Sequence, residues 1–236
     1  MVIKKKIQGK APTTVDMIYT LSTFYVDRSD VAEFVRINEE EIWPQLGTVP
    51  LGLWSVIMGG PNRLLMLCRY DSLQHWQTTC DWYADADSGV AAGRTNVIDA
   101  AEVTGLRPLT RRRPTDQAPE SQPGIYTMRT FKVAAENLRR FVEVSEEGWW
   151  PWVEAGQGLR PLVQWISIVA PETRVYMMAR YDDMAHWEAT RQVGPKPEDP
   201  ELIPVWETAR EAIAERGSLI IDTNVCVLRP ISQRRP

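Results

Sequence analysis

The sequence contains few residues of the kinds that build metal centres and disulfide frameworks. Its 236 residues include two histidines and three cysteines. The cysteines, Cys68, Cys80 and Cys226, form neither a CxxC pair nor an even set, and no HxH or HExxH motif is present. We therefore expect a reducing, cytoplasmic location, no bound metal and no other cofactor.

Long apolar runs and an excess of positive charge are also missing. No stretch approaches the roughly 20 apolar residues of a membrane-spanning helix, and the N-terminus lacks the apolar core of a signal peptide. The 27 basic and 31 acidic side chains leave a net charge of −4, which gives no general attraction to nucleic acid or anionic lipid. Phosphate-binding glycine loops and hydrolase nucleophile motifs are absent as well. Nucleic-acid and membrane partners are therefore not expected.

The sequence does contain an internal repeat. Four segments return in order: YTLSTF (19–24) as YTMRTF (126–131), RYD (69–71) as RYD (180–182), HW (75–76) as HW (186–187), and LRP (106–108) as LRP (228–230). These matches divide the chain into a first repeat at residues 13–110, a proline-rich linker at residues 111–123, and a second repeat at residues 124–232.

Both repeats have the same predicted order of elements, β-α-β-β-α-β. Alternating or continuously apolar segments predict the strands, and apolar residues spaced three and four apart predict the helices. The carboxylates of Asp30, Asp71 and Asp182 precede predicted helices and are expected to cap them. The predicted strands cover residues 17–26, 51–58, 64–68 and 99–106, and then 125–133, 162–169, 175–179 and 221–228.

This order of elements is the ferredoxin-like arrangement of the α+β class. Helices cover one face of such a sheet, so its other apolar face needs a partner. The third strands, residues 64–68 and 175–179, are apolar throughout, as expected for strands buried on both faces. We therefore predict that the two tandem ferredoxin-like repeats pack sheet to sheet as an intramolecular α+β barrel.

The repeated motifs resemble those of NIPSNAP-type domains. YTLSTF and YTMRTF resemble the opening strand of that family, and NRLLMLCRYDSLQHW, TRVYMMARYDDMAHW and the LRP triplets resemble the rest of its signature. The resemblance covers nearly the whole of both repeats. It implies the dimeric α+β barrel superfamily, whose members include cofactor-independent quinone-forming monooxygenases, aromatic polyketide cyclases and haem proteins of the chlorite dismutase type. NIPSNAP domains share no catalytic residue set that can be transferred to this chain.

The two repeats differ at positions that bear on function. The arginine of the family's opening strand is present as Arg129 in the second repeat, but Ser22 replaces it in the first. Trp149, Trp152 and an inserted segment at residues 194–204 occur only in the second repeat. Because a duplication keeps structural positions matched and lets one copy specialise, we expect the second repeat to carry the functional site.

The leading functional hypothesis is a cofactor-independent enzyme that cyclises, isomerises or oxygenates an apolar, aromatic or polyketide-like small molecule. The alternative is a non-catalytic small-molecule-binding or scaffold protein of the NIPSNAP type. The candidate catalytic residues are His186, as acid or base, and Arg129 and Arg180, which would orient an enolate or phenolate. The candidate substrate-binding residues are aromatic: Tyr126, Trp149, Trp150, Trp152, Trp165 and Tyr176.

Each candidate also has a purely structural interpretation. Matched tryptophans are typical of a core, and His186-Trp187 is then a packing dipeptide that both repeats inherited. Arg180 would pair with a carboxylate, for which Glu146 is a candidate.

If His186 is catalytic, His186→Ala abolishes function and the matching His75→Ala does not. The sequence leaves open whether the chain forms a homodimer.

Overall fold

The structure, a computed structural model, describes residues 17–46, 48–60, 62–84, 93, 96–110, 123–169 and 172–232. All eight predicted strands are present, whereas the predicted linker lies outside the described residues except for Pro123. The first repeat contains β1 (Ile18–Tyr25), β2 (Val49–Met58), β3 (Arg63–Tyr70) and β4 (Ala100–Pro108), and the second contains β5 (Ile125–Val133), β6 (Arg160–Ser167), β7 (Arg174–Tyr181) and β8 (Ile220–Pro230).

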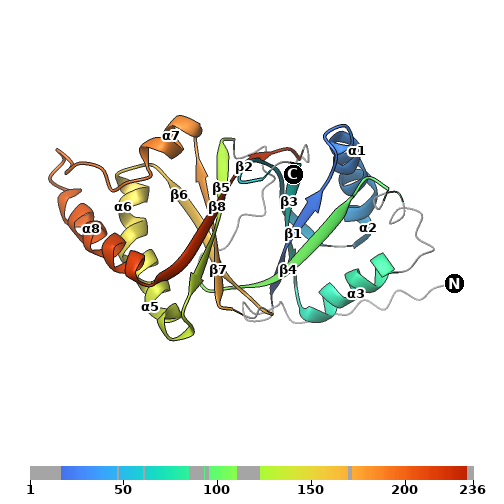
Figure 1. The fold of residues 1–236 in the computed structure, drawn as a ribbon, viewed down its shortest axis with the longest axis horizontal. Helices are drawn as coiled ribbons and strands as arrows, with labels where there is room; N and C mark the ends of the chain where they lie inside the picture. The colour runs from blue at the N-terminus through green and yellow to red at the C-terminus, as the bar shows by residue number, and fades with distance from the viewer. Residues whose placement is uncertain are drawn as a thin grey trace.

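The strands form one closed antiparallel barrel in the order β1-β3-β2-β8-β5-β7-β6-β4. The four strands of each repeat are neighbours, and the repeats join where β2 pairs with β8 and β4 pairs with β6. Figure 1 shows the helices of the two repeats on opposite outer sides of this barrel. The predicted fold, two ferredoxin-like repeats packed sheet to sheet with helices outside, is confirmed.

The helices follow the predicted order but consist of short segments. The first repeat has α1 (Val31–Arg36), η1 (Ile37–Ile42), α2 (Trp43–Leu46) and α3 (Leu73–Ala84), and the second has η3 (Ala135–Asn137), α5 (Leu138–Glu143), η4 (Val144–Trp149), α6 (Trp150–Ala155), α7 (Met184–Ala189) and α8 (Ile203–Ser218). The unpredicted η1 and η4 are π-helical. Each is followed closely by a proline, Pro44 or Pro151, whose missing N–H interrupts the α-helical hydrogen-bond pattern.

Two predicted helix caps are wrong by one residue. The side chains of Ser72 and Asp183, rather than those of Asp71 and Asp182, accept the backbone N–H three residues further on, at 3.1 and 2.8 Å. Asp30 stands at the expected N-cap of α1, but its side chain makes no capping hydrogen bond to a described residue. The prediction placed a carboxylate near each helix start without distinguishing neighbouring polar residues.

Three apolar clusters fill the molecule. One fills the barrel interior, where Tyr19 contacts Trp165 with 6.0 Å between ring centres, and Trp54 contacts Tyr126 with 5.6 Å. The repeat matches Tyr19 with Tyr126, and the offset of 111 residues that relates the two RYD segments also matches Trp54 with Trp165. The two contacts are therefore equivalent, and both join the repeats. The other clusters lie between the barrel wall and the helices. We call them the first outer layer, which includes Phe24 and Phe34, and the second outer layer, which includes Phe131 and Phe141.

Candidate functional site

A cavity of about 340 Å³ opens in the first outer layer, between α3 and the strands β1, β3 and β4. Its floor contains Thr20, Ser22 and Tyr70, all of which are buried. Its mouth is marked by Cys80 on α3 and Val103 on β4, which are exposed. An apolar space with a few polar groups at its floor is the usual form of a small-molecule site.

The polar groups of this cavity are uncharged at neutral pH. The side chain of Thr20 hydrogen-bonds the Tyr70 hydroxyl, but burial dominates and raises the pKa of Tyr70 well above its usual value. Burial and the neighbouring carboxylate of Asp81 raise the pKa of the Cys80 thiol. The cavity therefore offers neutral hydroxyl groups and a thiol, and suits an uncharged ligand.

The internal repeat explains why the cavity lies in the first repeat. Ser22 lines its floor, and the matching position in the second repeat is Arg129, whose guanidinium carbon lies 5.9 Å from the ring centre of Phe131. Phe131 matches Phe24, which lines the cavity in the first repeat. A small side chain thus leaves open a space that a long side chain enters in the other repeat.

The structure does not gather the predicted substrate-binding residues into one site. Three of them, Tyr126, Trp165 and Tyr176, belong to the cluster inside the barrel. The other three, Trp149, Trp150 and Trp152, are buried in the second outer layer. The barrel wall separates the two groups.

Arg180, a predicted catalytic residue, lies at the end of β7 and is buried. Its Nε donates to the carbonyl of Pro123 at 2.7 Å, and its Nη2 lies 3.4 Å from a carboxylate oxygen of Asp182. The expected carboxylate partner is therefore Asp182 rather than Glu146. These contacts link the chain entering β5 to the end of β7.

His186 and its counterpart His75 make the same kinds of contacts. In each, Nδ1 accepts the backbone N–H of the residue four positions earlier, Asp182 or Asp71. The Nε2 of His186 lies 2.7 Å from the carbonyl oxygen of Gln157, and that of His75 lies 3.4 Å from that of Leu46. Both ring nitrogens of each histidine thus contact the backbone, and the Nδ1 of His186 also lies 3.5 Å from a carboxylate oxygen of Asp182.

We expect His186→Ala to lower the free energy of unfolding by about 1–3 kcal/mol, because it removes two hydrogen bonds between the ring and the backbone, at Asp182 and Gln157. His75→Ala should cost less, because its Nε2 contact is longer. Urea unfolding of both variants measures the difference. A His186→Ala protein of unchanged stability that has lost ligand binding would instead support the predicted catalytic role.

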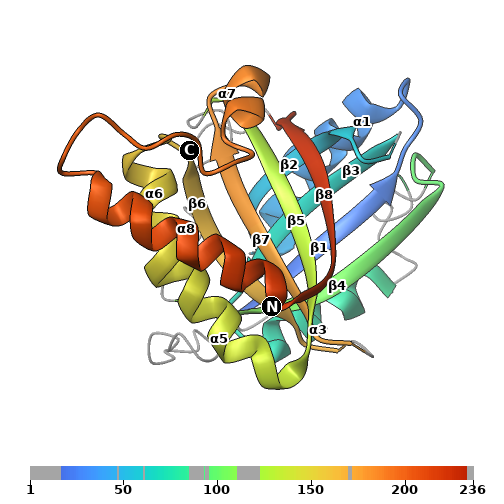
Figure 2. The same ribbon diagram turned by 60° about the vertical axis from the view of Figure 1, so that its left-hand side comes forward.

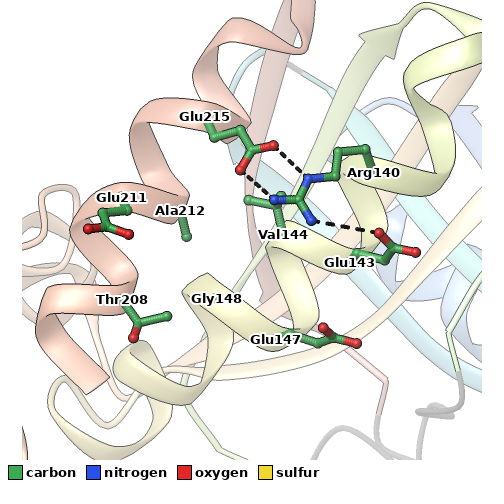
Figure 3. Close-up of a pocket in the computed structure, with 9 residues that line it drawn as sticks. All are labelled: Arg140, Glu143, Val144, Glu147, Gly148, Thr208, Glu211, Ala212 and Glu215. Atoms are coloured by element: carbon green, nitrogen blue, oxygen red, sulfur yellow. Dashed lines mark hydrogen bonds and ion pairs between the residues drawn. The ribbon is translucent and has the colours of Figure 1, made fainter. Parts of the chain in front are cut away.

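Two further hollows are open grooves on the surface. One, of about 350 Å³, lies between α8 and the α5–η4 segment, and Figure 3 shows Arg140 there between Glu143 and Glu215. The other, of about 620 Å³, lies beside α1 and includes Val31, Val35 and Ile231.

The described residues contain no group of three or more His, Cys, Asp or Glu side chains placed to hold a metal ion. Nor, within the described ranges, is any helix long and apolar enough to cross a membrane.

Comparison with known proteins identifies the fold. No protein-family model and no curated protein sequence matches the chain. An anthrone oxidase-like protein of known structure matches with a TM-score of 0.60 at 12% identity, over 93% of each chain. A protein of Lactobacillus acidophilus NCFM named as a candidate monooxygenase matches with a TM-score of 0.59 at 12% identity, over 91% of this chain and 94% of its own.

NIPSNAP proteins are also among the matches, over less than half of this chain. One from Agrobacterium tumefaciens str. C58 matches 42% of this chain and 90% of its own, at 19% identity and a TM-score of 0.36. At such identities, only the full-length matches carry weight, and they establish the architecture alone. The chain has the dimeric α+β barrel fold, with both halves of the barrel in one polypeptide.

Proposed function

We propose that the protein binds an uncharged, flat, apolar small molecule of aromatic or polyketide type in the cavity of the first outer layer. The observation that carries this proposal is the cavity itself, which is open at Cys80 and Val103 and lined mainly by apolar and aromatic side chains. Its buried hydroxyl groups, on Thr20, Ser22 and Tyr70, would orient a carbonyl or hydroxyl group of the ligand.

Cofactor-independent oxygenation of such a ligand is the second candidate function, and Tyr70 favours it. A neutral phenol in an apolar site donates a hydrogen bond to a ketone oxygen and stabilises the enolate that forms when a conjugated carbon, such as the CH₂ opposite the carbonyl of anthrone, loses a proton to water. With anthrone as the probe, the balanced reaction is anthrone plus O₂ giving anthraquinone plus water, which needs no external reductant. The cavity supplies no histidine as the base, because His75 has both ring nitrogens bonded to the backbone.

Ser22→Leu tests the proposed binding site. We expect the larger side chain to fill the floor of the cavity and to weaken anthrone binding about tenfold or more. The matched control, Ser22→Ala, keeps the space and should bind within a few-fold of the wild type. Binding is measured as protection of the Cys80 thiol from alkylation, with a Cys80→Ser protein to identify the reacting site.

Equal protection in the Ser22→Leu and wild-type proteins would place the ligand elsewhere. Tyr70→Phe then separates binding from turnover. If the protein is an oxygenase, this variant should keep Cys80 protection but lose anthrone-dependent oxygen uptake. If the wild-type protein binds anthrone and consumes no oxygen, the binding function stands and the oxygenase function does not.

A further inference from the structure

The second outer layer contains a buried arginine that has no carboxylate partner among the described residues. Arg216, near the end of α8, is only 6% exposed. Its Nε donates to the Ser145 hydroxyl at 2.8 Å, and its Nη2 lies 3.9 Å from the sulfur of Met177. Its guanidinium carbon lies 4.5 Å from the ring centre of Phe131 and 4.9 Å from that of Phe141. All of these partners are neutral.

A second arginine approaches the same ring. The guanidinium carbon of Arg129, on β5, lies 5.9 Å from the centre of Phe131, and its side chain makes no hydrogen bond or ion pair with any described residue. Burial lowers the pKa of both arginines, and the charge of Arg129 lowers that of Arg216 further. The neighbouring phenol of Tyr181 acts against burial and raises the pKa of Arg129, whereas the positive charge of Arg191 lowers it.

This arrangement is unfavourable unless something compensates it. Removing a guanidinium from water costs free energy, and aromatic rings and a hydroxyl group offset only part of that cost. Two like charges near one ring add repulsion. Arginine keeps its proton in proteins, so the layer holds two positive charges without a neutralising carboxylate from the described chain.

The position of Arg216 is fixed by the helices around it. In Figure 3, α8 crosses η4 where Gly148 faces Ala212, and a Cβ at Gly148 would overlap that of Ala212. The adjacent residue Glu215 accepts two hydrogen bonds from Arg140, at 2.6 and 2.7 Å. Figure 2 shows α8 continuing directly into β8, which pairs with β5. The guanidinium of Arg216 is therefore held in place before any ligand arrives.

The edge of the second outer layer beside β8 is partly exposed to solvent. Val225 stands opposite Arg129 in the β5–β8 register and is partly exposed, and Thr223 stands opposite Phe131 and is exposed. Directly paired residues of antiparallel strands point to the same face, so these side chains lie on the same side of the sheet as the two arginines. Solvent thus reaches the edge of the cluster from β8.

We propose that the second outer layer binds the carboxylate group of an apolar small molecule between Arg129 and Arg216. The planar guanidinium group matches a planar pair of carboxylate oxygens, and the surrounding Phe131, Met177 and Val225 suit an apolar body rather than a strongly hydrated anion. This site does not depend on the proposed function of the first repeat, where Ser22 stands in place of Arg129.

Benzoate, benzamide and inorganic phosphate are the probes for the test. Calorimetric titration of the full chain should show saturable benzoate binding, with benzamide and phosphate at least about tenfold weaker because one lacks charge and the other lacks an apolar body. Equal binding of phosphate would overturn the ligand class, and equal binding of benzamide would overturn the role of charge. Absence of benzoate binding would overturn the site.

Variants locate the site. Arg216→Met should raise the melting temperature of the ligand-free protein, because it removes a buried unneutralised charge, and should weaken benzoate binding about tenfold or more. A lower melting temperature with unchanged benzoate binding would show that Arg216 is purely structural and would overturn the proposal. Arg129→Met provides the same test if Arg216→Met fails to fold. Arg139→Met, in the exposed pair with Glu143, should leave benzoate binding unchanged.

Discussion

Residues 13–110 expressed alone are expected to aggregate or to form a homodimer, rather than to fold as a monomer. One face of their sheet forms half of the barrel interior, where Leu21, Leu67 and Leu106 are buried together with side chains of the second repeat. Without that repeat, a contiguous apolar surface and the edges of β2 and β4 would be exposed to water. A homodimer would restore the barrel by pairing Tyr19 of each copy with Trp54 of the other.

Size-exclusion chromatography with light scattering measures the outcome. Co-expression with residues 124–232 serves as the control and should yield a soluble one-to-one complex, because the missing face and strand partners are restored. A soluble, cooperatively unfolding monomer of residues 13–110 would show that the barrel interface is dispensable. It would also contradict the inference that the two repeats form one folding unit.

The strands were predictable from the sequence because their signal is local and occurs twice. Alternation identified β1 and β5, and the apolar runs identified β3 and β7, each within two residues of the observed bounds. The duplication strengthened both assignments, because two independent segments gave the same order. The π-helical turns were not predictable in this way, since the apolar spacing of an α-helix and that of a helix with one wide turn differ little over six residues.

The location of the cavity follows from one difference between the repeats, Ser22 in the first and Arg129 in the second. The sequence shows this difference, and from it we predicted a functional site beside Arg129, in the second repeat. The structure shows a cavity beside Ser22 in the first repeat. The residue types alone do not reveal such a space. Predicting a cavity requires the volumes of all neighbouring side chains, and these neighbours come from β1, β3, β4 and α3.

Arg216 could have been found from helical spacing. It follows Ala209 by seven residues and Ala212 by four, and both alanines are buried on the face of α8 that packs against the layer. A charged residue at a position reserved for apolar side chains is the type of exception that marks a functional or strained site. Trp149, Trp150 and Trp152 are buried in the same layer that Arg216 packs against.

Trp165→Ala should lower the free energy of unfolding by about 3–5 kcal/mol, and Trp54→Ala should lower it by a similar amount. Both side chains are buried inside the barrel, each against a tyrosine of the other repeat, so each truncation opens a cavity at the same kind of site. The indole N–H of each makes no hydrogen bond to a described residue, so packing alone accounts for the loss.

Urea unfolding with phenylalanine variants isolates that packing contribution. Trp165→Phe and Trp54→Phe remove volume but no hydrogen bond, so each should cost less than half as much as the alanine variant. Trp82→Ala on α3 is the control, because this side chain is only partly buried and contacts Tyr83 at the outer side of the first repeat. A large loss for Trp54→Ala and almost none for Trp165→Ala would show that the second repeat contributes little to the barrel core, and that the two ring pairs are not energetically equivalent.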